Sequence, residues 1–414
     1  MRRLIGILAC FLALAACQKP LFDPTPRWMR MQDRFTHFPH APEEETPDSL
    51  TLQLSSPGVF AVAVRFPEWA DWREGDYRGA EAVLFKDSTE LLSFPFRGDP
   101  APDRICLLDG ALWIDQTLEG RQTAVLRNGE MYLRYDGEEV LKGLLPLNGH
   151  LHTLGQRAGG KGLCYRIDGV AVFSSPVGNI LGSREDREWP GGALAADSSG
   201  VYYSYSIPVQ KGEETQHEYR IMRGAELVQT LAAGLAHTVF DIRPFNGVLY
   251  RSECRTPYSW SLCLVMADTP ISMNVGEGES VSRCRLVPYE GEMVMKGYST
   301  GLGGGKYTCW VRDHHGLRLT ASSNNPVADL FMYQGSSAYI TLDEGRVYQV
   351  FVGGVNTQAK PHTYLLKSAR CAVFQKGTLA MALSHATGTE HRLWVNGKII
   401  PLTFNGYFAA IQIQ

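Results

Sequence analysis

The segment from 246 to 250 reads Asn246-Gly247-Val248-Leu249-Tyr250, a two-residue turn that leads into a short strand. Asn-Gly favours a tight hairpin, because a type I′ turn needs positive φ at both central residues. The same punctuation returns seven times, and each glycine precedes a short run of strand-forming residues. These turns are Pro57-Gly58, Asp109-Gly110, Asn148-Gly149, Ser199-Gly200, Glu290-Gly291, Gln334-Gly335 and Lys376-Gly377. The pattern predicts a chain built from repeated β-hairpins.

A second turn lies inside nearly every interval between these glycines. It ends another strand-like run, and its clear copies are Asn128-Gly129, Asp168-Gly169, Arg223-Gly224 and Asn396-Gly397. Two hairpin turns in one unit imply four antiparallel strands in that unit.

The glycines of the first turn are 39 to 52 residues apart. Four short strands with their loops use roughly 40 to 50 residues in a propeller blade, so the chain resembles propeller repeats in general over about residues 50 to 414. It lacks the signatures of WD40 and kelch repeats. We therefore predict an all-β fold, a β-propeller of four-stranded antiparallel blades. The count favours eight blades, with seven as the alternative because the interval between Gly149 and Gly200 is irregular.

The two ends of the repeat region compete for one position. Leu50-Thr51-Leu52-Gln53-Leu54 alternates with a period of two, which predicts a half-buried strand at the start of blade one. Residues 408–413 form a last strand-like run with no hairpin partner after it. In ring propellers the terminal strand often joins the first blade, where it would compete with Leu50 to Ser55 for the innermost position or add to an incomplete blade.

The N-terminus carries a targeting pattern. Arg2 and Arg3 precede an apolar run, 4–16, that is too short to span a membrane and has the length of a signal-peptide core. The run ends Leu14-Ala15-Ala16-Cys17, which resembles a bacterial lipobox. That resemblance implies cleavage before Cys17, diacylglycerol on its sulfur and a further acyl chain such as palmitate on its amine. The alternative is an ordinary secretory signal that is cut elsewhere.

The resemblance also implies an address. Gln18 follows the cysteine where Asp would direct retention elsewhere, and by resemblance to Gram-negative lipoproteins this favours the outer membrane; either leaflet stays open. We expect a signal peptide over 1–16, a lipidated Cys17 with a proline-rich tether over 17–49, and the propeller over 50–414.

Composition narrows the classes of partner. The chain has 414 residues, 44% hydrophobic and 20% charged, with a formal net charge of −3. No basic stripe stands out, so nucleic acid is not an expected partner. No motif calls for a cofactor: the glycine-rich run 301–306 lacks both the Ser or Thr after its lysine and the strand-to-helix context of a phosphate-binding loop.

Cysteines and histidines offer no expected metal site. Seven cysteines follow Cys17 with no zinc-like spacing, and most sit in predicted strands as small apolar residues. The one pair that could bridge in an oxidising envelope is Cys254 with Cys263, on consecutive strands. Asp313-His314-His315-Gly316 reads as a repeat turn.

Blade topology directs attention to one face of the ring. With strands A to D from the axis outward, the A–B and C–D turns lie on one face and the longer B–C and D–A loops on the other. Loops on a rigid scaffold commonly carry binding sites. Aromatic rings beside charged groups suit sugar or peptide recognition. Our candidate ligand-binding residues on this face are Trp69, Asp71, Trp72, Tyr77, Arg187, Trp189 and Tyr258. The alternative is that Trp69 and Trp72 plug their own blade, and that 184–188 is a solvated charged run.

We therefore predict a lipid-anchored envelope propeller that binds a glycan, a peptide or another envelope protein without catalysis. The alternative is a carbohydrate-active hydrolase or lyase, for which the separation of two carboxylates would be decisive. The available carboxylates are Asp71, Glu74, Asp76, Glu185 and Asp186. A third option is a structural subunit of an envelope assembly. No G-x-S-x-G or H-E-x-x-H motif occurs.

Overall fold

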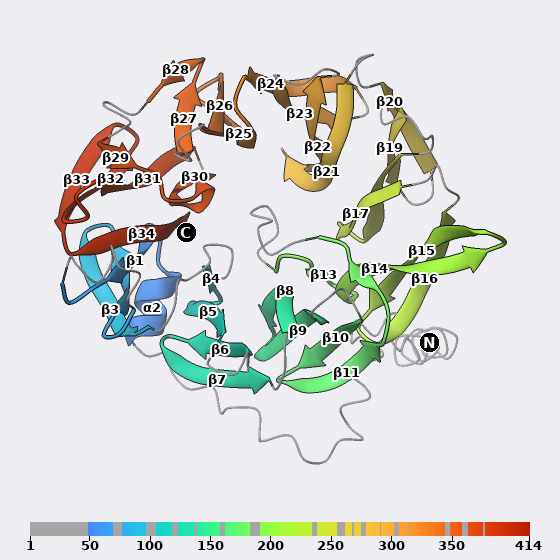
Figure 1. Ribbon diagram of the computed structural model, residues 1–414, viewed down its shortest axis with the longest axis horizontal. Helices are drawn as coiled ribbons and strands as arrows, with labels where there is room; N and C mark the ends of the chain where they lie inside the picture. The colour runs from blue at the N-terminus through green and yellow to red at the C-terminus, as the bar shows by residue number, and fades with distance from the viewer. Residues whose placement is uncertain are drawn as a thin grey trace, which may run out of the picture.

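Eight antiparallel sheets stand around a central axis in a computed structural model of the chain (Figure 1). The structure describes residues 49–68, 77–96, 105–117, 123–135, 139–157, 162–182, 191–233, 238–254, 261–266, 269–274, 279–289, 291–301, 306–313, 315–343, 348–357, 363–375 and 377–414. The predicted eight-bladed propeller is confirmed.

Each sheet is one blade, and its strands run from the axis outward. Blade 1 holds β34 (Gly406–Ile413), β1 (Val59–Arg65), β2 (Glu81–Lys86) and β3 (Thr89–Pro95). Blade 2 holds β4 (Ile105–Leu108), β5 (Ala111–Thr117), β6 (Thr123–Arg127) and β7 (Glu130–Tyr135). Blade 3 holds β8 (Glu139–Leu147), β9 (His150–Arg157), β10 (Leu163–Ile167) and β11 (Val170–Ser175). Blade 4 holds β12 (Asn179–Ile180) and β13 (Ala195–Asp197) innermost, then β14 (Gly200–Lys211), β15 (Glu214–Arg223) and β16 (Glu226–Ala233).

The second half of the ring follows the same plan. Blade 5 holds β17 (Thr238–Phe245), β18 (Val248–Cys254), β19 (Ser261–Met266) and β20 (Thr269–Asn274). Blade 6 holds β21 (Glu279–Tyr289), β22 (Glu292–Gly301), β23 (Tyr307–Asp313) and β24 (Gly316–Ser323). Blade 7 holds β25 (Val327–Tyr333), β26 (Ser336–Leu342), β27 (Tyr348–Val352) and β28 (Val355–Asn356). Blade 8 holds β29 (Tyr364–Leu365) and β30 (Ala372–Gln375) innermost, then β31 (Thr378–His385), β32 (Glu390–Val395) and β33 (Lys398–Thr403); a 3₁₀ turn, η4 (Ala369–Cys371), precedes β30.

The C-terminal strand closes the ring. β34 pairs antiparallel with β1, so that Ile413 lies opposite Val59 and Gly406 opposite Arg65. The chain ends of blade 1 are thereby joined by hydrogen bonds rather than by a covalent turn, and Gly58 exchanges backbone hydrogen bonds with Gln414. Of the two segments expected to compete for the innermost position, the C-terminal one holds it.

The predicted strand from Leu50 to Ser55 is wrong, because this segment forms the short helix α2 (Ser49–Ser55). β34 already occupies the inner edge of β1, which leaves the segment no strand to pair with. Leu50 and Leu54 are four residues apart and therefore share one helical face. Leu54 is fully buried and Leu50 partly buried, whereas Leu52 is 58% exposed.

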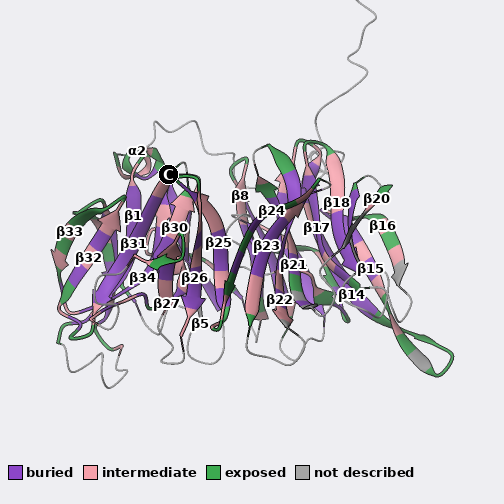
Figure 2. Ribbon diagram, turned by 90° about the horizontal axis from the view of Figure 1, so that it is seen from above, coloured by how far each residue is buried: buried purple, intermediate pink, exposed green. Residues whose placement is uncertain are grey.

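Helix α2 marks the face of the ring that carries the tight turns, which we call the turn face. The Lys86 ammonium at the β2–β3 turn donates to the carbonyl of Gln53, and the Gly110 turn lies against Thr51 and Ser55. Figure 2 shows α2 and the C-terminus at one edge of the ring, with the long β14–β15 hairpin projecting beyond the opposite edge. We call that opposite side, with the B–C and D–A connections, the loop face.

The turns have the backbone geometry that their sequence predicts. Asn246 and Gly247 adopt φ of 49° and 75°, and the second turn type shows the same pair of positive angles at Asn396 and Gly397, 46° and 89°. Positive φ at both central positions defines the type I′ hairpin.

The core lies between blades rather than inside one layer. Buried apolar clusters of the described residues join every pair of adjacent blades around the ring. The largest cluster joins blades 7, 8 and 1 and includes Phe408 of β34. Since a single sheet can cover neither of its faces, burial of apolar surface is what holds the blades in a ring.

Blade 4 explains the irregular spacing between Gly149 and Gly200. Its innermost strand is split into β12 and β13, and both pieces pair with β14. The residues between the two pieces lengthen this unit without adding a blade.

Cys254 and Cys263 are free, as are the other cysteines of the described residues. Cys254 lies opposite Leu262 in the β18–β19 ladder, and Cys263 lies opposite Glu253. Directly opposed residues share a face of the sheet and successive residues alternate. The two sulfur atoms therefore project from opposite faces, and this register excludes a disulfide between them.

Candidate functional site

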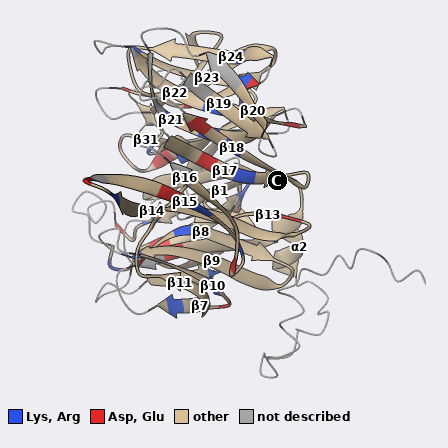
Figure 3. Cartoon of the chain, turned by 90° about the vertical axis from the view of Figure 1, so that its right-hand side faces the viewer, with Lys and Arg blue, Asp and Glu red and all other residues tan. Residues whose placement is uncertain are grey.

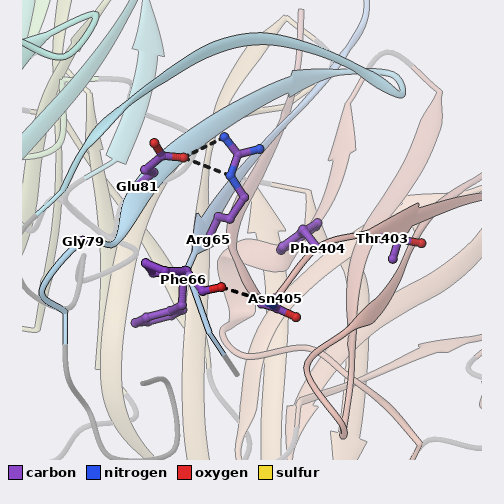
Figure 4. A pocket seen from close by; sticks show the side chains of 8 residues that line it. Arg65, Phe66, Gly79, Glu81, Thr403, Phe404 and Asn405 are labelled. Atoms are coloured by element: carbon purple, nitrogen blue, oxygen red, sulfur yellow. Dashed lines mark hydrogen bonds and ion pairs between the residues drawn. The ribbon is translucent and has the colours of Figure 1, made fainter. Parts of the chain in front are cut away.

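A pocket of about 480 Å³ opens on the loop face at the seam between blade 8 and blade 1 (Figure 4). Blade 1 supplies Arg65 at the end of β1 and Glu81 at the start of β2. Blade 8 supplies Thr403 at the end of β33. The remaining lining residues are Phe66, Pro67, Gly79, Phe404 and Asn405. The pocket thus joins segments that are far apart in the sequence and meet only because β34 closes the ring.

Backbone hydrogen bonds fix the two connections that form its walls. The Phe66 N–H donates to the carbonyl of Asn405 at 2.9 Å, and the Asn405 side-chain amide donates to the carbonyl of Pro67 at 3.4 Å. Gly406 follows with φ of 148°, and a Cβ there would lie 1.9 Å from the carbonyl oxygen of Val64. Only glycine permits this close approach of the two chains.

Three charged side chains form the polar wall. Nε and Nη2 of Arg65 donate to Oε2 of Glu81 at 3.0 and 2.7 Å. Nη1 and Nη2 donate to Glu90 on β3 at 2.8 and 3.2 Å. The hydrogen bond to Glu90 raises the pKa of Arg65, an effect that partial burial opposes and Glu81 reinforces. All three side chains remain between 31% and 40% exposed, so solvent reaches the group.

Aromatic rings form the apolar base. Phe404 stacks on His391 with ring centroids 3.9 Å apart and on Phe85 at 5.8 Å. Nε2 of His391 lies 2.9 Å from the carbonyl oxygen of Phe404 and donates to it, since that oxygen can only accept. Burial lowers the pKa of His391 to about 4, so its ring is neutral at neutral pH. The base of the pocket is therefore rigid and uncharged.

Tyr77 is the one predicted ligand-binding residue within the described part of the chain. Its ring lies 5.3 Å from that of Phe66, and its hydroxyl is 3.3 Å from the hydroxyl of Tyr407. It thus packs behind a residue that lines the pocket. The other six, Trp69, Asp71, Trp72, Arg187, Trp189 and Tyr258, lie outside the described residues, as does Cys17.

The carboxylates considered for glycoside hydrolysis, Asp71, Glu74, Asp76, Glu185 and Asp186, also lie outside the described residues. Within the described part of the chain, no group of three or more His, Cys, Asp or Glu side chains is arranged to hold a metal ion. The turn after β23 is closed by the Asp313 carboxylate, which accepts the backbone N–H groups of His315 and Gly316. On the side of the ring drawn in Figure 3, positive and negative positions are interspersed along the described strands.

The sequence analysis missed Arg65, Glu81, Thr403 and Asn405. Arg65 and Glu81 flank the long loop that attracted attention for its tryptophans, and they sit at strand ends that look ordinary. A usable signal was the expectation that the last strand joins the first blade. That expectation places the residues just before β34 beside those just after β1, which is where the pocket lies.

No protein-family model matches the chain, and no curated protein matches it. Among the described helices, none has both the length and the apolar character that crossing a membrane requires.

Several solved structures share the fold at low similarity. Apo AztD from Citrobacter koseri has a TM-score of 0.45 and 10% identity, over 86% of this chain and 97% of that one. The Dos1 propeller has a TM-score of 0.42 and 11% identity, over 72% and 83%. The β-propeller domain of the Trilobed protease from Pyrococcus furiosus has a TM-score of 0.42 and 10% identity, over 73% and 92%. One fold hosts many functions, so these likenesses carry no argument about what this chain binds.

Proposed function

We propose that this chain is a lipid-anchored envelope protein that binds a small ligand, or a short segment of a larger one, without catalysis. The observation that carries the proposal is the pocket on the loop face, with its Arg65–Glu81 wall and its aromatic base of Phe66 and Phe404. Ligand sites combine a largely apolar surface with a few convergent polar groups on a scaffold that is already formed. The volume of about 480 Å³ lies within the range of small-molecule sites.

The rigidity of the walls favours recognition. Asn405 is tied to both Phe66 and Pro67, and Phe404 is clamped between His391 and Phe85. A site whose side chains are already ordered loses little conformational entropy when the ligand binds. Aromatic rings with an amide, a hydroxyl and charged groups are also the mixture expected for a glycan or a peptide segment.

Anchoring at Cys17 is the second part of the proposal, and it rests on the lipobox Leu14-Ala15-Ala16-Cys17. Two or more acyl chains give stable membrane attachment. The described chain enters the propeller through α2 on the turn face, opposite the pocket. A tether that arrives there leaves the loop face directed away from the lipid, in whichever leaflet the anchor sits.

Lipidation is tested by mass spectrometry of the membrane fraction. We expect an N-terminal peptide that begins at Cys17 and carries the mass of diacylglycerol and an added acyl chain. The Cys17→Ala variant should lose the modification and leave the membrane fraction. An unmodified N-terminus elsewhere in the wild-type chain would refute the anchor and leave the binding site unaffected.

Binding is tested on the chain from Gln18, which retains both strands that close the ring. Glycan arrays and pull-downs from envelope extracts would be followed by titration calorimetry of each hit. Thr403→Trp fills the rim of the pocket, and Thr320→Trp on β24 is the matched control, since both threonines are exposed on outermost strands. We expect the first variant to abolish binding and the second to preserve it. Binding that survives Thr403→Trp would exclude this pocket.

A further inference from the structure

The charges of the pocket wall do not balance. One guanidinium, that of Arg65, lies between two carboxylates, Glu81 and Glu90. Both carboxylates are on blade 1, and His391 beneath the aromatic base is neutral at neutral pH. The wall therefore carries one net negative charge.

The donors of this wall are already used. Nε, Nη1 and Nη2 of Arg65 each donate to a glutamate oxygen, and Nη2 donates to both glutamates. Guanidinium groups bind carboxylates in such forked pairs because their donors are fixed in one plane. Arg65 consequently acts as a spacer that holds Glu81 and Glu90 in place, rather than as a donor offered to a ligand.

Acceptors remain at the same site. Glu81 binds Arg65 through Oε2 alone among the described residues, which leaves Oε1 for a ligand. Asn405 uses its amide N–H toward Pro67, so its side-chain oxygen also remains an acceptor. Thr403 adds a hydroxyl that is exposed at the rim. A ligand that fits this set must donate hydrogen bonds, and the excess carboxylate favours one that is positively charged.

We infer that the pocket takes a cationic group, a primary ammonium or a guanidinium on an apolar stem. The ionic head would lie against Glu81 and Asn405, and the stem against Phe66 and Phe404. This assignment rests on the proposed binding function and names its ligand class. The pocket is larger than one ammonium group, so the head belongs either to a small amine or to a basic side chain of a peptide.

An anion fits the same wall poorly. It would have to displace a glutamate from Arg65 in order to reach a donor, and the second glutamate would still repel it. A neutral sugar would find acceptors for its hydroxyls but would gain nothing from the net charge. Electrostatic attraction at a partly exposed site also weakens with salt, which gives the cationic assignment a signature of its own.

The test uses four small probes and two peptides with the chain from Gln18. The probes are n-butylammonium, methylguanidinium, butyrate and methyl β-glucoside, and the peptides are Ala-Lys-Ala and Ala-Gln-Ala with blocked ends. Saturation-transfer NMR titrations report binding of each. We expect binding of the two cations and of the lysine peptide only, with affinities that fall as the salt concentration rises. Preference for the peptide over n-butylammonium would identify a basic side chain as the source, and equal binding a free amine.

Glu81→Gln keeps the shape and one acceptor oxygen but removes the charge. We expect it to weaken cation binding about fivefold, the size typical of one partly exposed charge pair. Glu90→Gln is a second variant in case the first perturbs folding, and thermal unfolding checks both. Glu226→Gln is the matched control, because it removes an exposed partner of Arg223 on blade 4 and should leave affinity unchanged.

The outcomes separate this inference from the proposed function. Binding of butyrate or the glucoside, lost in Thr403→Trp, would keep the pocket and overturn its cationic preference. Cation binding that is equal in wild type, Glu81→Gln and Thr403→Trp would overturn both. Failure of every cationic probe to bind would overturn the cationic assignment, whatever ligand the wider screen finds.

Discussion

The side-chain amide of Gln412 pairs with both backbone polar groups of Leu107, although the two residues are 305 positions apart. Its Nε2 donates to the Leu107 carbonyl at 2.8 Å, and the Leu107 N–H donates to its Oε1 at 3.1 Å. Gln412 lies on β34, which also pairs with β1. The C-terminal strand is therefore joined to blade 1 by its backbone and to blade 2 by this side chain.

Gln412→Leu should destabilise the ring, because it removes two hydrogen bonds and leaves the N–H and C=O of Leu107 without them. We expect a loss of about 1–3 kcal/mol in the free energy of unfolding, measured by urea denaturation. Gln210→Leu near the exposed tip of the β14–β15 hairpin is the control and should change stability by less than about 0.5 kcal/mol. Equal effects of the two changes would show that the Gln412 contact does not hold the ring closed.

The second turn of a blade is tied to the second strand by one repeated contact. Oδ1 of Asn396 accepts the N–H of Leu379 at 2.9 Å, and the N–H of Asn396 donates to the Leu379 carbonyl at 3.0 Å. The same pair of bonds joins Asn128 to Leu112 and Asp168 to Leu151. These residues thus combine a positive φ with a side-chain acceptor, which Asn and Asp supply at little cost.

Substitutions at Asn396 separate these two requirements. Asp keeps both, Gly keeps the backbone conformation and loses the acceptor, and Ala loses the acceptor and is strained at positive φ. We expect stability to fall in the order Asn, Asp, Gly, Ala, with a total span of about 1–3 kcal/mol in urea denaturation. If Gly proved as stable as Asn, the acceptor would be irrelevant.

These turns explain why the architecture was predictable from the sequence. Asn-Gly and Asp-Gly are chosen by local backbone geometry, so Asn246, Asn128 and Asn396 mark hairpins without reference to the rest of the chain. The spacing of such turns then gives the blade and the number of blades.

The same reasoning failed where the outcome depended on distant residues. Leu50 to Leu54 fits a strand and a helix equally well over so short a run, and the presence of β34 on the edge of β1 decided for the helix. The pocket escaped notice for the same reason. Arg65 and Asn405 become neighbours only after closure of the ring, and no local pattern records that contact.

Stability should decrease as the pH falls from 6.5 to 4. Burial lowers the pKa of His152 and of His391 from 6.5 to about 4. The unfolded chain binds these protons in that window and the folded chain does not, so acid favours unfolding. Each histidine should contribute a loss on the order of 3 kcal/mol across the window.

Urea denaturation at several pH values between 7 and 4 measures this effect. His391→Gln keeps an N–H donor for the Phe404 carbonyl and removes the titration, so the slope of stability against pH should become shallower. His217→Gln, on an exposed stretch of β15, is the control and should keep the wild-type slope. A slope unchanged in His391→Gln would mean that His391 takes up its proton without unfolding.

All seven cysteines after Cys17 should be free thiols even when the protein is exported. The offset between Cys254 and Cys263 in their ladder directs the two side chains to opposite faces of blade 5. Alkylation of the unreduced chain from Gln18 in denaturant should add seven labels, counted by intact mass. Five labels, with a peptide linking these two cysteines, would contradict the register of β18 and β19.

The ion pair of Lys296 and Asp329 joins blade 6 to blade 7 at 2.5 Å, with both side chains nearly buried. Asp329 also accepts the N–H of Leu330 at 2.8 Å. Lys296→Met alone leaves a buried carboxylate without its cation and should cost about 3–5 kcal/mol in the free energy of unfolding. Lys296→Met combined with Asp329→Asn removes both charges and keeps an acceptor for Leu330, so most of that loss should be recovered. A double variant as unstable as the single one would mean that the attraction between the charges, and not the cost of an unpaired charge, holds this seam together.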